Sequence, residues 1–198
     1  QGLPQGLRTI EKTLESIIGG APNSVTMNKG IALRCMPRFA GKVPFIIQQM
    51  ALRPDEKSFA VNATVEEVVA MGADAIGVAM FLGDSLEMQY IQHLAAVVRE
   101  AERFGLPVIP HIYTLRSGDE KHAVTHDPED IFYAVRIGLE TGADIIKVPF
   151  TGDIASFRDI VSITPVPIVT AGGPKCETLE DAEHMLRDIV ASGAAGAT

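Results

Sequence analysis

Hydrophobic and polar positions follow two alternating periods along this chain. Short apolar runs, typical of strands buried on both faces of a sheet, are separated by longer segments with an apolar residue at every third or fourth position, typical of amphipathic helices. Most of the helical segments end in glycine, which accepts the left-handed conformation that terminates a helix. These joints lie at Gly20, Gly72, Gly105, Gly142 and Gly193. The pattern predicts a repeating α/β protein with a parallel sheet.

The apolar runs predict strands at residues 24–27, 43–50, 73–81, 107–113, 143–150 and 166–171, with a last strand starting near residue 194. The amphipathic segments predict helices at residues 7–18, 64–71, 85–104, 128–141 and 178–191. Thr64 and Thr178 each precede an acidic residue by three positions, as in a capping box, and Asp127 stands before Pro128. These are typical helix starts.

About seven strands follow a helix in this order, whereas a closed eight-stranded barrel normally opens with a strand. We therefore expect a single but incomplete (β/α)8 TIM-barrel domain over residues 1–198, with its first strand upstream of Gln1 and its eighth strand cut short at Thr198. An open, doubly wound sheet is the alternative, because periodicity does not reveal closure. Two long polar connections, 51–63 and 114–127, would lie at the carboxyl ends of strands, as lids or subunit contacts.

Composition narrows the partners and the cellular setting. The 198 residues are 46% hydrophobic and 21% charged, which fits one soluble globular domain. A net charge of -8 without a cluster of lysine or arginine argues against nucleic acid and anionic membranes as partners. With two cysteines, no signal-peptide pattern and no membrane-length apolar stretch, the chain is expected to be cytoplasmic.

Lys147 stands inside the apolar run 142–150, where a lysine is difficult to explain structurally. An ammonium group there loses hydration, so the neutral amine is favoured. A neutral amine in a dry pocket is a nucleophile for carbonyl carbon, which predicts Schiff-base chemistry. Snorkelling of the side chain toward solvent is the structural alternative.

Tyr113 ends the preceding predicted strand, and side-chain alternation places it on the same face as His111. If the two strands are parallel neighbours, Tyr113 and Lys147 are expected to contact the same bound substrate. An amine that attacks a ketone needs a proton-transfer partner, so Tyr113 is the predicted partner and His111 is predicted to orient it. A purely structural tyrosine at the strand end is the alternative.

Gly172 and Gly173 follow the strand at 166–171 and precede Lys175. Two glycines expose backbone N–H groups without obstruction by Cβ, and the lysine adds positive charge, so the turn is a predicted phosphate site. In many barrels the phosphate site follows strands seven and eight. A plain strand-to-helix turn is the alternative.

Two other chemistries are alternatives to the Schiff base. A metal held by His111, His122 and His126 would polarise a carbonyl, but the last two histidines lie in a polar loop, where solvated histidines are usual. Cys35 and Cys176 have no evident histidine and acid partners, which argues against a thiol nucleophile.

Asp74 and Asp144 repeat at the starts of two predicted strands. In a barrel that end is associated with stability, so both aspartates are predicted to be structural.

The segments 142–147, 150–153 and 171–175 resemble the archaeal-type class I fructose-bisphosphate aldolase family, which includes the 2-amino-3,7-dideoxy-D-threo-hept-6-ulosonate synthases. The resemblance covers nearly the whole chain. It implies a TIM barrel in which Lys147 matches the Schiff-base lysine, Tyr113 matches the proton-transfer tyrosine, and Gly172 and Gly173 match the phosphate site. It further implies metal-independent catalysis without a cofactor, and a homo-oligomer that is often a decamer.

Three departures from the family pattern bear on the site. The Asp-His-Gly segment of the first strand, whose aspartate serves in proton transfer in relatives, does not occur in this sequence, and neither does the late Gly-Arg-Asn stretch that completes their phosphate site. Tyr-Pro-Arg is replaced by Tyr-Thr-Leu-Arg, which displaces the arginine to Arg116 and bears on substrate preference. The sequence therefore predicts a class I aldolase acting on a phosphorylated ketose, with fructose 1,6-bisphosphate as the leading substrate. A transaldol-type synthase, a thiolase-like member and a non-catalytic phosphosugar-binding barrel are the alternatives.

Overall fold

The computed structural model describes residues 5–51, 58–83, 85–116 and 123–198. In these residues the main sheet has seven strands in the order β1-β2-β5-β6-β7-β8-β9, and all neighbours are parallel. The strands are β1 (Val25–Asn28), β2 (Phe45–Gln48), β5 (Ala75–Leu82), β6 (Val108–Thr114), β7 (Ile146–Val148), β8 (Ile168–Thr170) and β9 (Gly196–Ala197). The strand order follows the chain order, as expected for successive βα units.

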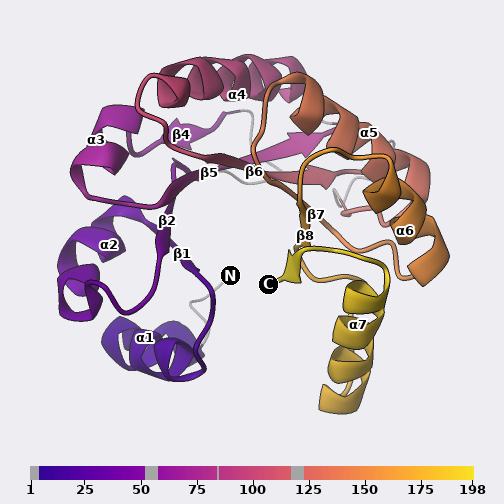
Figure 1. Cartoon of the computed structure of the whole chain (residues 1–198), viewed down its shortest axis with the longest axis horizontal. Coiled ribbons are helices and arrows are strands. Elements are labelled where there is room, and N and C mark those ends of the chain that lie inside the picture. The colour runs from indigo at the N-terminus through magenta and orange to yellow at the C-terminus, as the bar shows by residue number, and fades with distance from the viewer. Residues whose placement is uncertain (1–4, 52–57, 84, 117–122) are drawn as a thin grey trace.

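Helices connect successive strands and lie on the outer side of the curved sheet (Figure 1). They are α1 (Ile10–Gly19), α2 (Lys29–Cys35), α3 (Val65–Ala70), α4 (Glu87–Glu102), α5 (Pro128–Glu140), α6 (Ile154–Ser162) and α7 (Leu179–Ala191), with short 3-10 helices η1 (Gln5–Leu7) and η2 (Met36–Phe39). The sheet forms an open arc in which β1 and β9 are the edges. The predicted α/β barrel architecture is confirmed as a half-barrel, with a curled sheet inside and helices outside.

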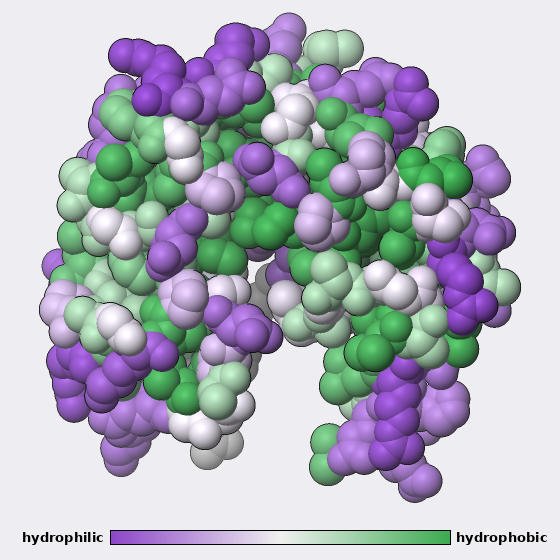
Figure 2. Space-filling model, viewed as in Figure 1, coloured by the Kyte–Doolittle hydropathy of each residue, from purple (hydrophilic) through white to green (hydrophobic). Residues whose placement is uncertain are grey.

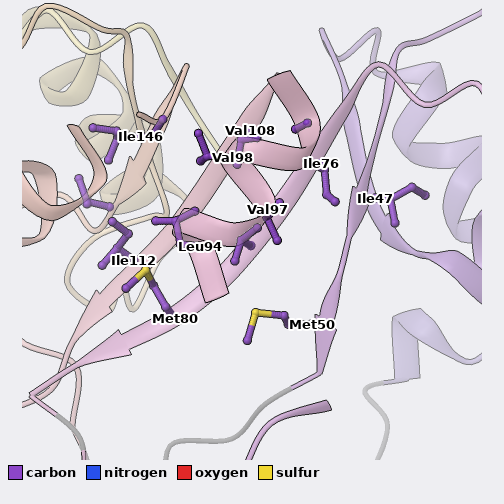
Figure 3. Close-up of a cluster of buried hydrophobic side chains, with 14 of the residues drawn as sticks. Ile47, Met50, Ile76, Met80, Leu94, Val97, Val98, Val108, Ile112 and Ile146 are labelled. Atoms are coloured by element: carbon purple, nitrogen blue, oxygen red, sulfur yellow. The ribbon is translucent and has the colours of Figure 1, made fainter. Parts of the chain in front are cut away.

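The main core lies between the sheet and the outer helices. Figure 3 shows Ile76 and Met80 of β5 and Val108 and Ile112 of β6 beside side chains of α4, such as Leu94. Burying each aliphatic side chain contributes roughly 1.5–3 kcal/mol, so this layer supplies most of the stability. Figure 2 shows hydrophilic residues over much of the outer rim and a gap between the two arms of the arc. Among the described helices, none has the length and apolar character needed to cross a bilayer.

Two helices, α2 and α6, were not predicted from the sequence. In α6 the Asp153 side chain accepts a hydrogen bond from Ser156 N–H at 2.8 Å, and Phe157 and Ile160 are buried one turn apart. This N-cap and spacing were a usable signal. The α2 helix has seven residues and contains Gly30, a weak helix former, so its local signal is poor. The β7 strand is shorter than predicted because Pro149 has no N–H for the ladder.

Both long polar connections are closed at their base by antiparallel pairing. The 51–63 connection begins and ends in the small sheet formed by β3 (Met50–Ala51) and β4 (Ala60–Val61). The 114–127 connection is closed by a bridge between Leu115 and Val124. Gly83 packs against this bridge with φ +79°, and a Cβ there would lie 2.7 Å from Leu115 O. The bases of both connections are therefore fixed at the carboxyl end of the sheet.

Asp74 and Asp144 make the same pair of hydrogen bonds at the opposite end of the sheet. The Asp144 N–H donates to Val108 O at 3.1 Å, and its carboxylate accepts from Val108 N–H at 2.8 Å. Asp74 repeats this arrangement with Phe45, at 3.0 and 2.9 Å. Each aspartate thus fixes the start of one strand to the start of its neighbour, which bears out the structural role predicted for both.

Replacing Asp144 with alanine is expected to lower the free energy of unfolding by about 1 kcal/mol, because the Val108 N–H loses its acceptor. Urea unfolding followed by circular dichroism measures this loss. The Asp144→Asn variant keeps an acceptor oxygen and should lose less. Equal stability of the alanine variant and the unmodified chain would contradict the assigned role.

Candidate active site

The sheet has two faces with different surroundings. Side chains that point outward join the main core, whereas Ile46, Ala75 and Ile109, with the partly buried Ile145 packed against them, form a separate cluster on the inner face. Lys147 lies two residues after Ile145 and therefore on the same inner face, while Ile146 packs in the main core. The lysine side chain is half-buried at this position.

His111 lies directly opposite Lys147 in the β6–β7 ladder. Tyr113 lies two residues further along β6 on the same face, and it pairs with Phe81 of β5, with the two ring centroids 5.8 Å apart. The predicted parallel neighbourhood of the two strands is thus confirmed. A lysine, a histidine and a tyrosine from adjacent strands converge on the inner face at the carboxyl end.

Burial controls the charges of these three groups. It lowers the pKa of Lys147 below its usual 10.5 and raises the pKa of Tyr113. Burial, aided by the nearby positive charge of Lys147, lowers the pKa of His111 to about 3. Near pH 7 the histidine and the phenol are therefore neutral, and a larger fraction of Lys147 is the free amine than for a lysine in water.

A cavity of about 380 Å³ opens beside His111 and Tyr113 at the carboxyl ends of β1, β2, β5 and β6. It is lined by Asn28, Gln48, Met50, Ala51, Ala79, Phe81, His111 and Tyr113. Its size suits a small metabolite.

The two glycines of the Gly172-Gly173 turn lie in different environments. Gly172 has φ +69°, a backbone conformation that would be strained in a residue with a side chain. A Cβ on Gly173 would lie 2.8 Å from the Met185 sulfur and 3.2 Å from Phe150 Cβ. The Phe150 N–H donates to Gly172 O at 2.8 Å, so the turn is joined to the segment that follows Lys147.

The two cations predicted near the site are differently placed. Lys175 is 83% exposed and forms an ion pair with Glu177 at 2.8 Å, in a pocket that Asp181 and Asp188 also line. Its charge is therefore already offset by acidic neighbours. The Arg116 side chain is exposed at the base of the 114–127 connection, where the backbone N–H of Arg116 donates to Ala123 O.

The described residues of the two alternative chemistries make other contacts. His126 Nδ1 donates to Phe150 O at 2.9 Å, His111 lies opposite Lys147, and His122 falls outside the described residues. In the described ranges, no three histidine, cysteine or acidic side chains group as a metal site would require. Cys35 is buried in the core, and the Cys176 sulfur contacts the Pro174 carbonyl and the Met185 sulfur.

Sequence reasoning missed the polar residues of the neighbouring strands, Gln48 and Asn28. Gln48 follows Ile46 by two positions, so it shares the inner face with Ile46. The Asn28 amide donates to Gln48 O at 3.1 Å. The signal was the one that identified Lys147, a polar residue on the inner face of an apolar strand.

Comparison with known proteins identifies the family. The model of the DeoC/LacD family aldolases matches residues 4–198. The chain is 33% identical to a 2-amino-3,7-dideoxy-D-threo-hept-6-ulosonate synthase of Halobacterium salinarum, over 98% of this chain and 72% of the relative. It is 34% identical to a class 1 fructose-bisphosphate aldolase of Thermoproteus tenax, over 88% of this chain and 65% of the relative.

Among solved structures, an archaeal fructose-1,6-bisphosphate aldolase matches with a TM-score of 0.82 and 30% identity, over 95% of this chain and 74% of that one. Its catalytic lysine is covalently bound to the carbinolamine intermediate of the substrate. A further structure, of a Schiff-base-forming fructose-1,6-bisphosphate aldolase, matches with a TM-score of 0.83 and 31% identity over 95% of this chain and 74% of that one. The chain belongs to the DeoC/LacD family of aldolases, within its class I, Schiff-base-forming enzymes.

Proposed function

We propose that this chain cleaves or forms a carbon–carbon bond in a phosphorylated ketose, with fructose 1,6-bisphosphate as the leading substrate and Lys147 as the imine-forming residue. The observation that carries the proposal is the placement of a half-buried lysine amine on the inner face of the sheet, opposite a neutral histidine. The relatives named above support the substrate class.

In this mechanism the Lys147 amine attacks the ketone carbon and forms a carbinolamine, which loses water to give an iminium ion. The bond between the α and β carbons of the iminium then breaks, and its electron pair forms the enamine. The proton of the β-hydroxyl group passes to the Tyr113 oxygen, which has just protonated the departing water, so the other fragment leaves as an aldehyde. The resulting enamine takes up a proton, and water then hydrolyses the imine. No oxidant or reductant is needed.

Tyr113 is the proposed proton donor and acceptor of these steps. Its phenol stays protonated near pH 7 because burial raises its pKa, so it can protonate the departing hydroxyl of the carbinolamine. His111 lies across from Lys147 and stays neutral, so it places no positive charge beside the forming iminium ion. It is proposed as a positioning residue.

The substrate phosphate is proposed to bind at the Gly172-Gly173 turn. The Phe150 N–H to Gly172 O hydrogen bond holds this turn beside the segment after β7. Lys175 is proposed only as a peripheral contributor, because it is exposed to solvent and forms an ion pair with Glu177.

The second candidate is a transaldol-type synthase that uses the same imine, favoured by the Halobacterium salinarum relative. Assays of aldol cleavage and of transaldol synthesis, run side by side on the same preparation, distinguish the two.

Lysine trapping tests the central step. Borohydride reduction in the presence of dihydroxyacetone phosphate is expected to leave a covalent adduct on Lys147, found by peptide mass analysis, and Lys147→Met should abolish it. Lys12→Met, at an exposed position on α1, is the matched control and should retain the adduct. Phosphate-ester binding without any adduct would support the non-catalytic barrel instead.

The pH dependence follows from the lowered pKa of Lys147. The adduct should form faster as pH rises, with its midpoint below the usual lysine value of 10.5, because only the free amine attacks. Since His111 titrates near pH 3, no second transition is expected between pH 5 and 8. A transition near pH 6.5 that disappears in His111→Gln would contradict the assigned environment.

Replacing Tyr113 with phenylalanine should lower kcat by roughly 10²–10⁴-fold, because the proton-transfer group is removed while the ring packing is kept. Steady-state kinetics measure the loss. Phe81→Leu changes the packing partner and keeps the hydroxyl, so a loss of similar size there would assign Tyr113 a packing role.

A further inference from the structure

The side chain of Gln48 has an unusual environment for a polar group. Its Nε2 and Oε1 atoms are buried, and within the described part of the chain neither has a hydrogen-bond partner. Leaving a buried polar group unsatisfied costs about 1–3 kcal/mol, so such a group calls for an explanation.

Gln48 lies on the wall of the cavity that His111 and Tyr113 also line. Its neighbour in the ladder is Gly77, and a Cβ at Gly77 would lie 3.0 Å from Gln48 Oε1 and 3.4 Å from His111 Nε2. The glycine thus leaves the space in which the Gln48 amide approaches the imidazole. His111 in turn lies opposite Lys147. The unsatisfied amide therefore lies beside His111, the ladder partner of Lys147.

The chemistry of this wall selects the kind of ligand. A carboxamide offers both a donor and an acceptor, which matches a hydroxyl group, whereas its acceptor oxygen opposes a phosphate. Asn28 is the other carboxamide of the cavity, and of its described lining residues none is charged near pH 7. An uncharged, hydroxylated carbon chain fits this wall better than an anionic group.

We propose that Gln48 determines specificity by hydrogen-bonding a hydroxyl group on the carbon chain of the substrate fragment that departs as the aldehyde. This rests on the proposed imine at Lys147. The Gly172-Gly173 turn would hold the phosphate of the ketone fragment, and Gln48 would contact the other fragment from β2.

The synthesis direction gives the sharpest test. The enamine formed on Lys147 from dihydroxyacetone phosphate attacks the carbonyl carbon of an added aldehyde, a new carbon–carbon bond forms, and water releases the product from the imine. D-Glyceraldehyde and propanal are acceptors of equal chain length that differ only in their hydroxyl groups. The measured quantity is the ratio of kcat/KM for these two acceptors.

Gln48→Met keeps the length of the side chain and removes its hydrogen bonds. We expect the preference for glyceraldehyde over propanal to fall about tenfold, with the change in the acceptor KM rather than in adduct formation. Adduct formation with dihydroxyacetone phosphate should stay within about twofold, which also shows that the variant folds. Gly77→Ala displaces the amide without changing Gln48 and should lower the same ratio.

The outcomes separate the two proposals. If the unmodified chain forms no borohydride-trapped adduct on Lys147, the proposed function fails, and this inference fails with it. If the adduct forms but Gln48→Met leaves the acceptor ratio unchanged, or slows both acceptors equally, only the role of Gln48 is overturned.

Discussion

The whole site depends on the desolvation of one amine. Lys147 occupies the inner face of a strand whose other inner residue, Ile145, packs against Ile46, Ala75 and Ile109. Partial burial of the amine disfavours the ammonium and lowers the pKa of Lys147. A positively charged neighbour would have the same effect but would also repel the iminium ion. The structure instead places opposite it a histidine that remains neutral.

In this fold the contacts that stabilise the sheet and the groups of the candidate site lie at opposite ends of the strands. At the amino end, Asp74 and Asp144 fix adjacent strands with paired hydrogen bonds. At the carboxyl end, the inner face carries amide, imidazole and phenol groups around an open cavity. The strand starts are thus held independently of the site, so the loops and inner side chains at the other end can change without loss of the sheet.

Much of this was predictable from local patterns. The glycine joints and apolar runs predicted the strand order, and side-chain alternation predicted that Lys147 and Tyr113 share one face. Each of these two inferences depends only on residues that are close in sequence. The ion pair between Lys175 and Glu177 was missed because strand alternation and turn-residue preferences do not show which exposed side chains pair with one another. Gln48 lies within the predicted strand 43–50, but its orientation was missed because apolar residues occupy both faces of that strand, so alternation there does not distinguish the inner face from the outer one.

Two glycines shape the site because they lack a side chain. At Gly77 the missing side chain admits the Gln48 amide beside His111, and at Gly173 it admits the Met185 sulfur and Phe150. Both positions adjoin residues that are positioned for chemistry or for the proposed phosphate contact, yet neither glycine offers a functional group itself. The space at Gly77 therefore matters to this cavity as much as side-chain chemistry does. A methyl group there would lie 3.0 Å from Gln48 Oε1 and 3.4 Å from His111 Nε2, and so would crowd the amide beside the ladder partner of Lys147.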